Sequence, residues 1–351
     1  MSPFPEEPLD SEVGYIPAKP EDKLDNDKYT VLGKLGWGAR SSVWLVADNE
    51  DPDRILAAKV FTVEATEDGT AEEEKDLYEG LGGHHTDIPI FQGSFEHESS
   101  RGTHLVLLFV HIGPSVEALR LSNTDGGYIP VHFAKKIVAR LASILSTLHS
   151  DHRIVHGGVK AENVLITSVF DASSIRSYLE SSPFLPPSDF VKGELKEPFP
   201  VVKSQPLDHG FKWNSPRSSI AGADVYLTGL GSAAAGKNDN EFKTDIQDLG
   251  LLAFLLVTGT PLFPGNHDKV RANAETIGRV EELLTQSGKI AASDVPSTAS
   301  FIRSCLKSAL HELPSGFELL SNPWVEDGSL CSCGWCVTDP IDGILATKQT
   351  V

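Results

Sequence analysis

The chain has 351 residues, of which 40% are hydrophobic, 8% aromatic and 23% charged. These fractions are typical of a globular protein, and the length predicts roughly two domains or one large bilobal domain with a sizeable core. The 49 Asp and Glu residues outnumber the 30 Lys and Arg residues, which gives a formal net charge of −19. Because this charge repels polyanions at long range, we expect no binding to nucleic acid or to an anionic membrane surface.

The first 28 residues are rich in Pro, Glu and Asp and have no periodic apolar pattern. They predict a disordered acidic leader over residues 1–28 and lack the basic and apolar regions of a secretory signal. The longest apolar run, residues 249–263, is too short to span a bilayer and predicts a buried helix. We therefore expect no membrane attachment and a cytoplasmic location, with the nucleus as the alternative.

Residues 29–113 alternate between strand signals and one helix signal. Two apolar, β-branched runs surround a Gly-rich turn in residues 29–47, and residues 55–63 predict a third strand. Residues 70–81 predict a short amphipathic helix that two glycines end, and residues 88–95 and 104–111 predict two further strands. The sequence thus predicts a small antiparallel sheet with one helix.

After Gly113 the pattern changes to long helices. Residues 131–150 place apolar side chains at helical spacing and contain no proline, which predicts a buried helix. Residues 167–220 contain seven prolines, which predicts a Pro-rich insertion without continuous elements. The remaining residues to about 325 predict a mainly α-helical part, and residues 326–351 form a Cys-containing tail.

The four cysteines are Cys305 and a cluster of Cys331, Cys333 and Cys336 in the tail. No histidine lies near the cluster to complete a tetrahedral zinc site. We therefore expect exposed, reduced thiols. Two alternatives remain open: a zinc site completed by Cys305 or by a partner, and a disulfide.

The Gly-rich turn belongs to a larger pattern. Gly36 and Gly38 lie between two predicted strands, where glycines let the backbone approach phosphates and offer N–H groups to them. Sixteen positions after Val43 comes Lys59 on the third strand, followed by Glu74 on the predicted helix. The turn alone is weak evidence, but the turn, the strand lysine and the helix glutamate together are a specific signal.

This order of elements resembles the eukaryotic protein kinase superfamily. The segments LGKLGWGARSSVWL, GTHLVLLF, GPSVEAL and HGGVKAENVL are similar to fungal serine/arginine-protein-kinase-like proteins. The resemblance implies an α+β, bilobal protein-kinase-like fold over residues 29–325. Its small antiparallel β-rich N-lobe with one helix would cover residues 29–113, and its mainly α-helical C-lobe residues 114–325.

The resemblance also implies ATP as the cofactor and a set of residues around it. Lys59 would pair with the phosphates, Glu74 would be its ion-pair partner, and Phe109 would lie near the gatekeeper position of a hinge at residues 108–112. The full implied set is Gly36, Gly38, Ser41, Val43, Lys59, Glu74, Phe109 and His111. Asp245 would anchor the central helix of the C-lobe. A second explanation of Lys59 and Glu74, a structural ion pair without nucleotide, stays open.

The chain departs from the family at the catalytic positions. Where the family has His-Arg-Asp, this chain has His156, Gly157 and Gly158, so the general base is missing. Loss of a positioned general base costs about 10²- to 10⁴-fold in rate. Lys160 and Asn163 survive in the same loop, and Asn163 retains part of one metal site.

The chain also departs from the family at the main magnesium ligand and at the Ala-Pro-Glu motif of the platform that binds the substrate peptide. Where the family has Asp-Phe-Gly, this chain has Gly229-Leu230-Gly231, so the main Mg²⁺ ligand is missing, which argues against Mg²⁺ binding. Asp224 would lie roughly 16 Å back along an extended strand and cannot replace it. The short stretch from Gly231 to Asp245 contains no Ala-Pro-Glu motif.

Three hypotheses follow. The favoured one is a catalytically impaired kinase homologue, a pseudokinase, that acts as a regulatory or binding module with a protein partner and with ATP as its candidate ligand. The alternative is a weakly active or atypical serine/threonine kinase of the serine/arginine-protein-kinase type that uses Lys59, Lys160 and Asn163. The third is a scaffold closed to nucleotide, which docks through the insertion or the tail.

Overall fold

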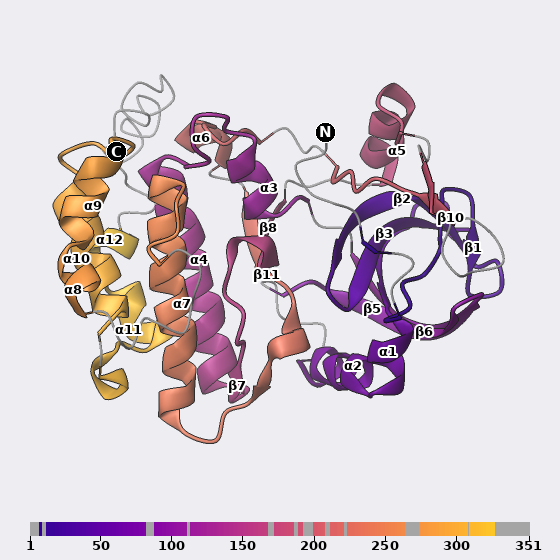
Figure 1. The fold of residues 1–351 in the computed structure, drawn as a ribbon, viewed down its shortest axis with the longest axis horizontal. Helices are drawn as coiled ribbons and strands as arrows, with labels where there is room; N and C mark the ends of the chain where they lie inside the picture. The colour runs from indigo at the N-terminus through magenta and orange to yellow at the C-terminus, as the bar shows by residue number, and fades with distance from the viewer. Residues whose placement is uncertain are drawn as a thin grey trace, which may run out of the picture. The chain divides into compact units, whose positions relative to one another are not determined.

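The computed structural model describes most of the chain (Figure 1). The described residues are 7–8, 12–81, 88–110, 113–167, 172–185, 189–191, 199–207, 211–220, 223–263, 274–307 and 309–326. They divide into two compact units, which we describe one at a time. The first unit takes the described residues of 1–113 and 169–209, and the second takes those of 114–168 and 210–351.

The first unit is built on a six-stranded antiparallel sheet with the strand order β1-β2-β3-β4-β6-β5. Its strands are β1 (Lys23–Leu24), β2 (Tyr29–Gly38), β3 (Ser41–Asp48), β4 (Ile55–Phe61), β5 (Phe91–Ser99) and β6 (Gly102–Val110). Helix α2 (Thr70–Leu81) contacts β5 and β6. The predicted antiparallel sheet and its helix are confirmed. The short β1 and the short helix α1 (Val63–Glu67), which Thr62 caps, were not predicted.

The prediction of a disordered leader is wrong for residues 12–28. Tyr15 and Ile16 are each 3% exposed, and Leu24 lies in the core beneath the sheet. The backbone of Glu21 donates to Val31, and β1 pairs with the start of β2. The apolar side chains of this segment are isolated in the sequence, so they show no period of their own. They become buried only because the folded sheet offers them a surface.

The predicted insertion also contains more structure than its prolines suggested. Helix α5 (Ala172–Ser181) spans ten residues, and short elements β9 (Asp189–Val191), β10 (Phe199–Val201) and α6 (Arg217–Ile220) follow. The prolines do not interrupt α5, because the first of them is Pro183, which lies beyond its end. The expectation of a segment without continuous elements is therefore wrong for α5.

The insertion is divided between the two units. Its described residues up to 207 belong to the first unit, whereas the sequence assigned the whole insertion to the helical lobe. Ile175 and Leu207 pack with Leu45 and Ile55 in one buried cluster. The assignment failed because the insertion follows helical-lobe residues in sequence, while its apolar side chains find their partners on the sheet.

The second unit is mainly α-helical. Helices α4 (Val131–Ser150) and α7 (Asp239–Thr258) pack side by side, as Figure 1 shows, and α10 (Val295–Cys305) packs against α7. The other helical elements are α3 (Val116–Leu121), η1 (Ala161–Asn163), η2 (Leu230–Ser232), α8 (Ala274–Gly278), α9 (Val280–Ser287), η4 (Leu310–Glu312), α11 (Gly316–Leu320) and α12 (Pro323–Glu326). The predicted helix over 131–150 is confirmed at both ends.

Two small ladders position the loops of the second unit. Strand β8 (Val164–Thr167) pairs with β11 (Asp224–Leu227), and β7 (Ile154–Val155) pairs with β12 (Ala234–Ala235). The apolar run that begins at Leu249 forms the buried second half of α7. Among the described helices, none combines the length and the apolar character that crossing a membrane requires.

Candidate functional site

The Gly-rich turn of the first unit joins β2 to β3. Gly36 pairs with Val43 and Gly38 pairs with Ser41, and a register shift lies just before Gly36. A Cβ atom built on Gly36 or Gly38 would meet no atom within 4 Å. Packing among the described residues therefore does not explain why either position is glycine. The open space over the backbone is what a turn that receives phosphate oxygens requires.

Lys59 and Glu74 form a close ion pair. The Lys59 Nζ lies 2.6 Å from Glu74 Oε1 and 2.7 Å from Oε2, so β4 is tied to helix α2. The Glu74 side chain is 2% exposed, whereas that of Lys59 is 18% exposed. The Lys59 Nζ also lies 4.6 Å from the centroid of the Phe61 ring. The buried carboxylate thus holds a partly accessible ammonium group in a fixed place.

The predicted hinge is described only in part. Phe109 on β6 is 7% exposed, and its ring lies edge-on to the Tyr78 ring of α2 with centroids 4.8 Å apart. The ring of Phe91 lies 6.0 Å away. Phe109 therefore belongs to an aromatic cluster between the sheet and α2. His111, the other predicted hinge residue, lies outside the described residues.

In the second unit, Asp245 of α7 holds the loop that carries His156. Its Oδ2 accepts from the His156 backbone N–H and its Oδ1 from the Gly157 backbone N–H, each at 2.8 Å. The His149 Nε2 lies 2.8 Å from Oδ2. His156 is fully buried, and burial lowers the pKa of its imidazole. The loop is therefore held in place although Gly158 supplies no carboxylate.

Two glycines of this region have backbones that other residues adopt poorly. Gly157 and Gly229 have φ angles of +68° and +86°. A Cβ on Gly157 would lie 2.7 Å from the Ser232 carbonyl oxygen, and one on Gly229 would lie 2.8 Å from the Asn163 carboxamide. The arginine and the metal-binding aspartate of active kinases therefore do not fit these positions without rearrangement.

Asn163 occupies the space beside Gly229. Its Nδ2 donates to the Gly158 carbonyl oxygen at 2.9 Å, and its backbone carbonyl accepts from Thr228 at 2.8 Å. The Lys160 side chain is exposed. Asn163 thus has a structural role in this loop.

The donor atoms present do not fit Mg²⁺. This ion takes oxygen ligands and is usually held by one or two carboxylates, and positions 158 and 229 carry none. Asp224 lies exposed at the start of β11, paired with Thr167, five residues before Gly229. Within the described ranges, no group of three or more His, Cys, Asp or Glu residues is arranged to hold a metal ion.

Asp248, which sequence reasoning missed, has an unusual environment. Burial and the nearby charge of Asp245 raise the pKa of its carboxyl group to about 7, although the Val159 backbone N–H opposes the shift. Two acids three residues apart on the central helix are the sequence signal that could have indicated this pair. The carboxyl group titrates close to neutral pH beside the loop of residues 156–159.

The surroundings of Cys305 give little support to the two alternatives for the cysteines, a zinc site completed by Cys305 and a disulfide. This residue is fully buried, and its burial raises the thiol pKa to about 12. It packs so closely on α7 that a Cβ on Gly250 would lie 2.6 Å from the Cys305 Cβ. Cys331, Cys333 and Cys336 lie outside the described residues.

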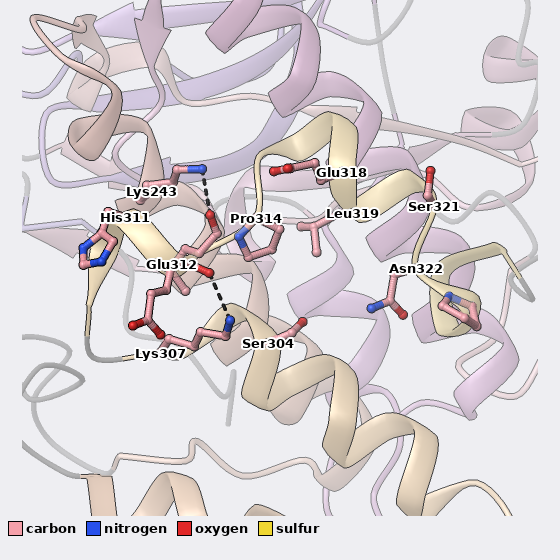
Figure 2. Close-up of a pocket in the computed structure, with 12 residues that line it drawn as sticks. Lys243, Ser304, Lys307, His311, Glu312, Pro314, Glu318, Leu319, Ser321 and Asn322 are labelled. Carbon is pink, nitrogen blue, oxygen red and sulfur yellow. Dashed lines mark hydrogen bonds between the residues drawn. The ribbon is translucent and has the colours of Figure 1, made fainter.

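A separate cavity of about 650 Å³ opens in the second unit (Figure 2). Lys243 and Lys307 at its edge donate to the backbone carbonyls of Leu313 and Glu312, at 2.8 and 3.1 Å. Both ammonium groups therefore fasten the segment between α10 and α11. The lining includes neither Asn163 nor Gly229, so this cavity is distinct from the degenerate loop.

Comparison with known proteins supports the same fold. Residues 29–175 match the protein kinase domain family. The crystal structure of the PF14_0431 kinase domain has a TM-score of 0.59 to this chain with 16% sequence identity, and the similarity covers 90% of this chain and 100% of that one. Together with the sheet, the helical unit and the Lys59–Glu74 pair, these likenesses define a protein-kinase-like fold.

Curated relatives narrow the resemblance. The chain is 28% identical over 158 residues to serine/threonine-protein kinase SRPK of Physarum polycephalum, covering 44% of this chain and 36% of that protein. It is 32% identical over 166 residues to protein kinase dsk1 of Schizosaccharomyces pombe (45% and 30%), and 30% over 181 residues to SKY1 of Saccharomyces cerevisiae (48% and 24%). The matches thus span about a quarter to a third of these relatives. Residues 29–175 thus match a protein kinase domain, and the chain resembles the SRPK kinases over less than half of its length.

Proposed function

We propose that this protein is a pseudokinase of the SRPK type, which binds ATP weakly and serves as a regulatory or binding module for a protein partner. The proposal rests on two features. The Lys59–Glu74 ion pair is present, and glycine stands at positions 158 and 229, where active kinases have acidic residues. We also propose that it acts in the cytoplasm, with the nucleus as the alternative location.

The observation that carries the proposal is the backbone of Gly229. Its left-handed backbone, with φ of +86°, is one that aspartate adopts poorly, and a Cβ there would lie 2.8 Å from the Asn163 carboxamide, so a metal-binding aspartate does not fit without rearrangement. Phosphoryl transfer depends on charge neutralisation by the metal. The return of an aspartate at position 229 would therefore also require a change of the backbone there or of the Asn163 side chain.

The argument for ATP comes from the first unit. A kinase domain binds ATP in general, and the Lys59 ammonium group is held by a buried carboxylate while 18% of its side chain stays accessible. The ammonium has three donors, and two of them face Glu74. The space over Gly36 and Gly38 is open. Binding through these groups needs no Mg²⁺ ligand from the protein.

The test is a thermal-shift titration with ATP, with and without Mg²⁺. A ligand at 100 times its dissociation constant stabilises the folded state by about 2.7 kcal/mol, which gives a readily measured shift. We expect a shift in the wild type that Mg²⁺ does not increase and that Lys59→Ala abolishes. Lys75→Ala is the matched control, since Lys75 lies on α2 and pairs only with a solvent-facing carboxylate, Glu72.

The rival function, a slow kinase, is tested by phosphate transfer. Labelled ATP and an Arg/Ser-rich peptide are incubated with the wild type and with Lys59→Ala. Peptide-dependent transfer that Lys59→Ala removes would establish the enzyme and overturn the pseudokinase proposal. If millimolar ATP gives neither a thermal shift nor transfer, the chain is a scaffold that works without nucleotide.

A further inference from the structure

The leader reaches the tip of the Gly-rich turn. The Tyr15 hydroxyl lies 2.9 Å from both the Gly38 and the Ala39 carbonyl oxygens and donates to them. Its ring is 3% exposed and meets the Trp37 ring edge-on, with centroids 6.1 Å apart. Burial, with a smaller effect from the negative charge of Glu7, raises the pKa of Tyr15, so the hydroxyl keeps its proton at neutral pH.

The backbone on either side of Tyr15 is fixed independently of the turn. The Gly14 carbonyl accepts from the Val63 N–H at 2.9 Å, and the Val13 carbonyl accepts from Glu64 at 3.1 Å. Gly14 has a φ of +72°, and a Cβ there would lie 2.9 Å from the Val63 side chain. Tyr15 is therefore presented by a segment that is anchored on the first turn of α1.

The middle of β2 is held as well. The Lys34 ammonium pairs with Glu7 of the leader and lies 3.4 Å from the Val202 carbonyl oxygen of the insertion. The side chains of Lys34 and Glu7 are 1% and 3% exposed. Separating a buried ion pair is costly. The leader and the insertion thus fix the strand that leads into the turn, and Tyr15 fixes its tip.

The contact of Tyr15 determines where the N–H groups of the turn point. All peptide bonds in the described residues are trans. In a trans peptide the N–H of the next residue points opposite to the carbonyl. Because the Gly38 and Ala39 carbonyls face Tyr15, the N–H groups of Ala39 and Arg40 point away from it. Consecutive backbone N–H groups of this kind are donors that can bind the oxygens of a phosphate group.

We propose that Tyr15 is a positioning residue for phosphate binding, which pre-orients the N–H groups of Ala39 and Arg40 by holding the carbonyls behind them. The inference rests on the proposed ATP binding. It assigns the leader a part in the nucleotide site. It also predicts that Tyr15 affects the binding of the phosphates of ATP but not the binding of its adenosine.

The experiment compares Tyr15→Phe with the wild type in the full chain, by calorimetric titration with ATP and with adenosine. The substitution removes the hydroxyl and keeps the ring. One lost hydrogen bond predicts ATP binding about two- to tenfold weaker, with adenosine binding unchanged. Tyr178→Phe on α5, whose ring packs with the cluster around Leu45, is the matched control and should leave both affinities unchanged.

The outcomes separate the inference from the function. If the wild type binds ATP and Tyr15→Phe binds it equally well, the positioning role is wrong while the proposed function stands. Equal weakening of ATP and adenosine would mean that Tyr15 only supports the fold of the unit, which also overturns the inference. If the wild type binds neither ligand, the proposed ATP binding fails, and the positioning role fails with it.

Discussion

The crowded backbone at Gly229 leads to a quantitative prediction. Gly229→Ala forces a side chain into the left-handed region at φ +86° and places its Cβ 2.8 Å from the Asn163 carboxamide. The left-handed conformation costs a non-glycine residue about 1–2 kcal/mol, and overpacking adds about 1–3 kcal/mol. We expect the free energy of unfolding to fall by about 2–5 kcal/mol.

Thermal unfolding followed by circular dichroism measures this loss. For a unit of this size, the expected change corresponds to a fall in Tm of roughly 4–20 °C. Gly278→Ala is the matched control in the same unit. Gly278 lies in α8, has ordinary helical backbone, and a Cβ there meets nothing within 4 Å. This control should be neutral or slightly stabilising.

A double-mutant cycle isolates the contact itself. Asn163→Ala removes the carboxamide, so Gly229→Ala should cost less in that background, and the remaining loss should approach the backbone strain alone. A Gly229→Ala protein that is as stable as the wild type, within about 0.5 kcal/mol, would refute the reasoning.

Three further predictions concern other sites. The pKa of Asp248 is about 7 in the folded chain against 3.8 for an exposed aspartate, so the folded state holds a proton that the unfolded state has released between these values. The stability that this proton contributes is therefore complete below pH 4. As the pH rises from 4 to 7, the free energy of unfolding falls by up to about 1.4 kcal/mol per pH unit. Urea unfolding at pH 5–8 should show a flatter profile for Asp248→Asn, and an unchanged slope would contradict the assignment. Cys305 should resist a thiol reagent in the native chain and react after unfolding, as mapped by mass spectrometry, whereas fast native labelling would disprove its burial. Phe184→Ala should cost about 2 kcal/mol, because the ring packs over Gly33, and should expose the insertion to limited proteolysis. Leu185→Ala, at a neighbour that is 55% exposed, is its control, and equal cleavage of the two variants would argue against this packing.

Local patterns in the sequence were enough to predict the regular elements of both units. The helical period of residues 131–150 and 70–81 predicted α4 and α2 with their observed ends, since each helix buries one continuous apolar face. The apolar, β-branched runs of residues 29–47 and 55–63 likewise predicted three neighbouring strands, of which the third ends at Phe61, two residues earlier than predicted. The spacing of Lys59 and Glu74 predicted a pair that the structure places within 2.6 Å.

Only the tertiary structure determined where the less regular segments pack and which side chains they bury. Tyr15 and Phe184 lie in segments with no period of their own. Tyr15 is buried and Phe184 is partly buried because β2 offers them surfaces at Gly38 and Gly33. The sequence predicted the loss of an acid at Gly229, but the left-handed backbone and the closeness of Asn163 come from β8 and β11 meeting in space. The raised pKa of Asp248 depends on burial beside Asp245, because the charged form loses its hydration there.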